Sequence, residues 1–162
     1  MSVLINSSTT KDFKVEKGLR QGDHLSPFIF VLAREALTAL MRKSRERGDF
    51  RGFKINGDKE VDMLQLADDT IIIAKRDTAN LWSLKTVLRG FELMSGSRIN
   101  FHKSNVYGLN VGNWFMEAAS SSLSCNVGTL PFKFLGVKVG GNSRRISLWK
   151  DLILMMRKRL AV

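Results

Sequence analysis

The sequence has one cysteine, no long apolar run and comparatively little negative charge, and each shortage excludes a class of protein. Cys125 alone cannot form an internal disulfide, and it argues against a cysteine-based zinc site. No apolar run approaches the ~18 residues of a membrane span, and the Met1 end lacks a signal-peptide pattern. These features favour an intracellular protein with no membrane partner.

Positive charge is what the chain has in excess, with 26 Lys and Arg against 15 Asp and Glu and a net charge of +11. Residues 1–57 carry 11 basic against 6 acidic side chains, residues 58–110 carry 7 against 7, and residues 111–162 carry 8 against 2. Basic flanks around a balanced middle suit a protein that grips polyphosphate at its edges. A generally basic protein is the alternative. The 162 residues, 44% of them hydrophobic, fit one globular domain.

The most unusual stretch places two adjacent carboxylates between two apolar runs. Asp68 and Asp69 follow residues 61–66 and precede residues 71–74, and both flanking runs are apolar and rich in strand formers. This pattern predicts a tight β-hairpin with the acidic pair at its tip. Two neighbouring carboxylates repel each other unless a cation sits between them. A solvated turn is the alternative interpretation.

Caps, turns and apolar spacing predict the other elements. Ser26 and Pro27 suit the start of a helix that stops at Gly48, and its apolar stripe runs from Phe28 through Leu32 to Leu40. A second helix is expected to be capped by Thr78 or Asn80 and to close at residues 95–96. The remaining expected elements are a hairpin of residues 2–6 and 12–16, a strand at 52–57, a helix at 116–123, a strand pair at 131–141 and a helix at 148–160.

Four motifs follow one another within residues 18–140. Residues 18–30 read GLRQGDHLSPFIF, and residues 66–70 read LADDT. Residues 95–104 read SGSRINFHKS, and residues 130–137 read LPFKFLGV. In this order the motifs resemble those of the reverse transcriptase of plant-like LINE-type (non-LTR) retrotransposons. The family patterns are R-G-L-R-Q-G-D-P-L-S-P-x-L-F, the catalytic hairpin [FY]-A-D-D-T, S-G-L-x-I-N-x-x-K-S and L-P-x-x-Y-L-G.

The resemblance implies an α+β fold, namely a polymerase palm in which an antiparallel sheet is backed by two helices. Residues 1–141 would form a partial palm, and residues 142–162 would begin the thumb or connection helix. The first palm strand, the fingers and most of the thumb are expected to be missing, so the fold would be truncated. A sheet without its first strand should have an exposed edge, which favours aggregation or marginal stability.

The resemblance also implies an RNA-directed DNA polymerase that uses an RNA template, a DNA primer and dNTPs. Its chemistry is nucleotidyl transfer with two Mg²⁺ ions ~4 Å apart. Asp68 would be the direct metal ligand and Asp69 its less essential neighbour. Lys103 would protonate or neutralise the pyrophosphate, with an ordinary surface lysine as the alternative.

Two further groups are assigned to substrate and template by the same resemblance. The first would lie under the incoming nucleotide and the templating base, and it consists of Arg20, Gln21 and Gly22. The second would support the primer terminus, and it consists of Phe134, Leu135 and Gly136. Core packing is the alternative for Phe134 and Leu135.

The sequence departs from the family pattern at three places. Leu66 replaces the aromatic residue before Ala-Asp-Asp, and His24 replaces a proline. The family's first metal-binding aspartate belongs to an earlier strand, and Asp12 does not occupy such a setting. We therefore expect this polypeptide to be inactive alone. The alternatives are a non-catalytic nucleic-acid-binding remnant and a degenerate element-derived product with no selected role.

Overall fold

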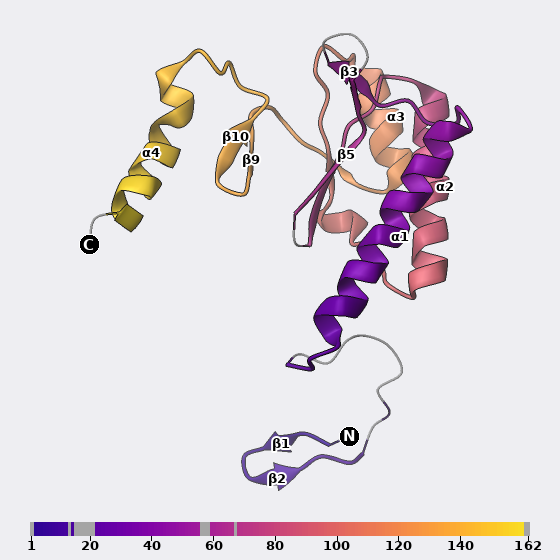
Figure 1. Ribbon diagram of the computed structural model, residues 1–162, viewed down its shortest axis with the longest axis vertical. Helices are drawn as coiled ribbons and strands as arrows, with labels where there is room; N and C mark the ends of the chain where they lie inside the picture. Colours follow the sequence, from indigo (N-terminus) through magenta and orange to yellow (C-terminus); the bar gives the residue numbers. More distant parts are fainter. Residues whose placement is uncertain (1, 13, 15–21, 56–58, 67, 161–162) are drawn as a thin grey trace. The chain divides into compact units, whose positions relative to one another are not determined.

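The computed structural model describes residues 2–12, 14, 22–55, 59–66 and 68–160. In these residues the fold is α+β, with four α-helices and pairs of short strands (Figure 1). The chain divides into two compact units, Met1–Ile99 and Asn100–Val162. None of the described helices is long and apolar enough to cross a membrane.

Two helices form the body of the first unit. Helices α1 (Ser26–Glu46) and α2 (Thr78–Ser95) lie side by side (Figure 1). Their contact buries apolar side chains from the second half of α1, from α2 and from the loop after α1: Leu37, Met41, Phe50, Val87 and Leu88. The first half of α1 is not covered by described residues, since Phe28 and Leu32 are 70% and 68% exposed. Only part of the expected apolar stripe is therefore buried.

The helix ends confirm the predicted stops and correct the predicted starts. Gly48 follows α1 with φ +77° and Gly96 caps α2 with φ +67°, which are left-handed conformations that glycine adopts without a steric penalty. The N-cap of α1 is Leu25 rather than Ser26, which is already helical. The N-cap of α2 is Asp77, whose carboxylate accepts from the Ala79 amide at 3.0 Å.

The strands of the first unit form three antiparallel pairs in the described residues. Their members are β1 (Leu4–Ile5) with β2 (Ser8–Thr9), β3 (Phe53–Ile55) with β4 (Lys59–Val61), and β5 (Met63–Leu66) with β6 (Asp69–Ile72). The α+β class is confirmed, but these residues form separate two-stranded ladders rather than one small sheet. The pairing of the first strand differs from the expected one, because the chain turns at Asn6 and Ser7 and β1 pairs with β2. Of the expected strand at 12–16, residues 13, 15 and 16 lie outside the described residues.

A buried asparagine ties the segment after β6 to the segment before β3. Asn80, 3% exposed, accepts from the Arg51 amide at 2.8 Å and donates to the Arg51 and Lys75 carbonyls at 3.0 and 2.8 Å. The Lys75 amide also donates to the Arg51 carbonyl at 3.2 Å. These bonds satisfy backbone groups that would otherwise be orphaned beside the helix.

The second unit contains a short α-helix among short strands and ends in a longer α-helix. Its elements are η1 (Phe101–Lys103), β7 (Asn105–Val106), α3 (Asn113–Leu123), β8 (Asn126–Val127), β9 (Phe132–Phe134), β10 (Val137–Val139) and α4 (Ile146–Leu160). Strands β7 and β8 are parallel, whereas β9 and β10 are antiparallel. Phe115, Met116 and Ala119 of α3 are buried. The Lys138 ammonium lies 2.9 Å from the Asp151 carboxylate, joins β10 to α4 and lowers the pKa of Asp151.

Candidate functional site

The β5–β6 hairpin carries the acidic pair where the sequence predicts it. Leu66 pairs with Asp69, and of the two residues between them only Asp68 lies in the described part. Asp68 thus occupies the turn and Asp69 begins β6, and both side chains are exposed. The predicted hairpin is confirmed with a two-residue turn.

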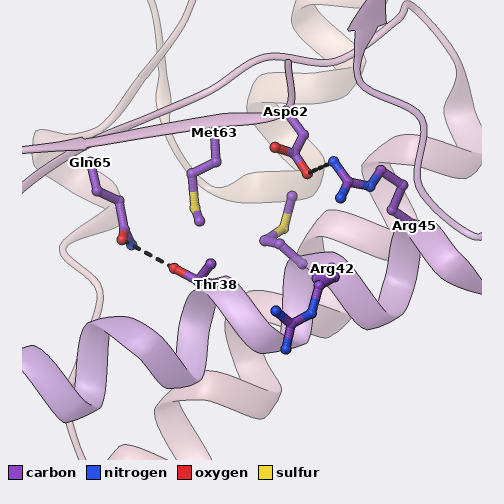
Figure 2. A pocket seen from close by; sticks show the side chains of 7 residues that line it. Thr38, Arg42, Arg45, Asp62, Met63 and Gln65 are labelled. Carbon is purple, nitrogen blue, oxygen red and sulfur yellow. Dashed lines mark hydrogen bonds and ion pairs between the residues drawn. The ribbon is translucent and has the colours of Figure 1, made fainter. Parts of the chain in front are cut away.

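The hairpin is fixed to α1 by two polar contacts. The Thr38 hydroxyl lies 3.3 Å from the Gln65 amide oxygen, and an Arg45 guanidinium nitrogen lies 3.1 Å from an Asp62 carboxylate oxygen. Figure 2 shows both contacts crossing from the helix to the strand above it. Because Gln65 is three residues before Asp68, the first contact anchors the strand close to the turn.

A cavity of about 210 Å³ lies between these contacts. Met41 of α1 and Met63 of β5 supply its apolar wall, and Arg42 reaches its edge from the helix (Figure 2). Two of its polar contacts already join the helix to the hairpin. The cavity therefore belongs to the support of the hairpin.

The donor chemistry of the acidic pair fits a hard divalent cation, but the donor number does not. Carboxylate oxygens are the ligands that Mg²⁺ prefers, and Asp68 and Asp69 offer them from adjacent positions, the second at the start of β6. Within the described residues, no group of three His, Cys, Asp or Glu side chains is placed to hold a metal ion. We therefore derive no catalytic step through a metal from these residues.

The residues expected under the nucleotide are described only in part. Arg20 and Gln21 lie outside the described residues. Gly22 has φ +84°, a conformation that side chains rarely adopt, and no described heavy atom lies within 4 Å of a Cβ built there. The following turn is fixed by the Asp23 carboxylate, which accepts from the Leu25 amide at 2.8 Å.

The remaining predicted residues lie in the second unit. Phe134 ends β9, and Leu135 and Gly136 form the β9–β10 turn with φ +50° and +84°. Leu135 is 51% exposed, while Phe134 is half-buried. Positive φ at a leucine is uncommon, and such outliers cluster at functional sites. Lys103 is exposed at the end of η1. Phe134, Leu135 and Gly136 are therefore brought together in one turn.

Sequence reasoning missed the residues that position the hairpin. Thr38 and Arg45 lie seven residues apart on α1, two turns along one face of the helix, and both reach the hairpin. The available signal was weak, because Arg34 and Arg42 lie on the same helix face and are also polar. The partners of the two contacting residues are Gln65 in β5 and Asp62 just before it, and the sequence around these two partners does not indicate a contact with the helix.

Comparison with known proteins agrees with this arrangement. The family model for reverse transcriptase (RNA-dependent DNA polymerase) matches residues 2–139. An uncharacterized mitochondrial protein of Arabidopsis thaliana is 33% identical over 110 residues, which make up 64% of this chain and 85% of that protein. The matched family segment includes the acidic hairpin and the β9–β10 turn. This chain therefore belongs to the reverse transcriptase family.

Proposed function

We propose that this chain is the palm portion of a LINE-type, non-LTR reverse transcriptase and that it is inactive as a separate polypeptide. Members of the family act on a nucleic-acid template and primer and use divalent metal ions. The observation that carries the proposal is the hairpin, with Asp68 in its turn and Asp69 at the start of β6. In this assignment residues 1–141 are partial palm and residues 142–162 begin the thumb.

The two carboxylates would hold Mg²⁺, with Asp68 as the direct ligand. The metal would supply charge neutralisation at the transferring phosphate. Support for inactivity comes from the donor set, because the described residues contribute no third metal-binding side chain beside the pair. Arg20, Gln21 and Gly22 are proposed to contact the nucleotide and template, Lys103 the pyrophosphate, and residues 134–136 the primer terminus.

Primer extension on an RNA template with a DNA primer, dNTPs and Mg²⁺ tests the proposal. We expect no extension by the 162-residue chain, with a complete reverse transcriptase as the positive control. Extension by this chain that disappears in Asp68→Asn would show that the chain holds a complete site. The matched control is Asp49→Asn, which neutralises an exposed carboxylate paired with Arg47 at 3.2 Å, away from the hairpin turn.

Charge favours a second candidate, a nucleic-acid-binding module without catalysis. The second unit, residues 100–162, has 9 Lys and Arg against 2 Asp and Glu. Such an excess should bind phosphate backbones with a steep salt dependence, because each contact releases counterions. Undetectable or salt-insensitive binding to RNA and DNA would remove this candidate.

A further inference from the structure

The junction of β3, β6 and α2 holds three cations without described partners. The side chains of Arg51, Lys75 and Arg76 are exposed, and no hydrogen bond or ion pair joins them to another described residue. Some other surface cations of this unit are paired, since Arg47 and Arg89 each have a carboxylate partner, at 3.2 and 2.6 Å. At this junction, by contrast, three exposed cations have no partner among the described residues.

The three cations are held together by the buried asparagine. Asn80 bonds to the backbones of Arg51 and Lys75, which also bond to each other. Arg76 follows Lys75 directly and precedes the N-cap of α2. Since both connecting segments are bonded to one buried side chain, the origins of the three flexible side chains are fixed relative to one another.

Three acidic side chains near the cations in sequence make contacts elsewhere. Asp49 pairs with Arg47, Glu60 accepts from the Gly52 amide, and Asp77 accepts from the Ala79 amide. Within the described residues no carboxylate pairs with Arg51, Lys75 or Arg76, so these cations can bind an external anion.

An exposed aromatic ring follows the first of these cations in the chain. Phe53 is 54% exposed and begins β3, two residues after Arg51. Cations beside an exposed aromatic ring are the chemistry of single-strand binding, with phosphates on the cations and a base stacked on the ring.

We propose that Arg51, Phe53, Lys75 and Arg76 form a binding surface for single-stranded nucleic acid, here called the β3–α2 surface. Asp69 and Lys75 are six residues apart, so the surface lies no more than about 22 Å along the chain from the acidic hairpin. One strand with a rise of ~3.4 Å per nucleotide reaches from one to the other in about six nucleotides. This inference rests on the proposed function in one respect only, namely that the partner is a nucleic acid.

Fluorescence anisotropy with a labelled 20-nucleotide RNA, in EDTA and over a salt series, tests the cations. The triple variant Arg51→Gln, Lys75→Gln, Arg76→Gln should bind at least about tenfold more weakly at low salt. Its salt slope should fall by about 2, because each lost contact with a single strand removes ~0.7. The matched control replaces Lys43, Arg47 and Arg89, which have carboxylate partners, and removes the same net charge. Equal losses in the two triples would overturn the proposal.

A second variant tests the aromatic ring and the kind of strand. Phe53→Leu keeps an apolar side chain but removes the ring, and it should weaken single-strand binding about tenfold while leaving an RNA–DNA duplex unaffected. The matched control is Phe28→Leu, an exposed phenylalanine of α1. Unchanged single-strand affinity in Phe53→Leu would overturn the assignment. Tighter binding to phosphatidylserine vesicles than to RNA, lost in the triple variant, would identify a membrane surface instead.

Both assays are independent of catalysis. EDTA removes divalent ions, so binding through the β3–α2 surface should persist in Asp68→Asn. If the chain extends a primer while the triple variant still loses binding, the surface stands and the proposed inactivity fails. If the chain shows no extension while the triple variant keeps its affinity, the surface fails and the proposed function stands.

Discussion

Replacing Asn80 by alanine should destabilise the first unit by about 2–3 kcal/mol. The substitution removes three hydrogen bonds of 2.8–3.0 Å from a side chain that is 3% exposed. At roughly 1 kcal/mol each these contribute about 3 kcal/mol, and the partners left behind are the amide and carbonyl of Arg51 and the carbonyl of Lys75. The better helix propensity of alanine offsets about 0.5 kcal/mol. The remainder is a large share of a typical domain stability of ~5–15 kcal/mol.

Urea unfolding followed by circular dichroism measures this loss, which should lower the midpoint by roughly 1–2 M at a typical m-value of ~1.5 kcal/mol/M. Amide hydrogen exchange localises it, because the Arg51 amide loses its acceptor and should exchange faster. The control is Thr86→Ala on the same helix, whose exposed hydroxyl donates only to the Trp82 carbonyl. Its effect should stay within about 0.5 kcal/mol. An Asn80→Ala variant as stable as Thr86→Ala would refute the reasoning.

Two more predictions concern the same unit. Gly52→Ala should destabilise the chain by about 1–3 kcal/mol, because the new Cβ would sit 2.6 Å from the Val61 carbonyl oxygen. Gly90→Ala, in the open middle of α2, should instead stabilise it by up to about 1 kcal/mol. Changes of the same sign in the free energy of urea unfolding would contradict this. The pKa of Glu92 is lowered mainly by the Ile99 amide, which donates to its carboxylate at 2.8 Å. This contact therefore stabilises the folded chain fully at pH values above the ordinary pKa of 4.5. The stabilisation is lost as the pH falls through the lowered pKa of the folded chain. Glu92→Gln should therefore be less stable than the native chain at pH 7 and nearly equal to it at strongly acidic pH, and a pH-independent difference would contradict the assignment.

The hairpin was predictable because its signals are local. Apolar residues on both sides of a polar pair specify two short strands, and the turn between them has room for only two residues. The glycine stops of α1 and α2 were predictable for the same reason, since a left-handed cap strongly favours glycine.

The errors arise where several residues suit one local role. Asp77, Thr78 and Asn80 are all good helix caps, and the sequence does not rank them. Asp77 is the cap because the Asn80 side chain is buried and forms hydrogen bonds with the Arg51 and Lys75 backbones. At the chain start, Asn6 and Ser7 both adopt positive φ, which closes the turn earlier than the expected hairpin of residues 2–6 and 12–16 requires.

The candidate site also has one part that the sequence predicts and one part that it does not. Its carboxylates are visible in the sequence, while the contacts that hold them are not, because Thr38 and Gln65 are 27 residues apart. Helical spacing likewise predicted α1 but not which of its turns would be covered, since covering depends on the packing partner rather than on the stripe itself.

Asn80 links the stability of the first unit to its proposed binding surface. It carries no charge and makes its bonds to the backbone, so its replacement leaves the charges of Arg51, Lys75 and Arg76 in place but frees the segments that carry them. A loss of RNA affinity in Asn80→Ala would therefore report the positions of the cations rather than their number. If affinity depended on net charge alone, this variant would bind as tightly as the native chain. The Asn80→Ala variant thus distinguishes a surface whose cations are held in position from one that binds through net charge alone.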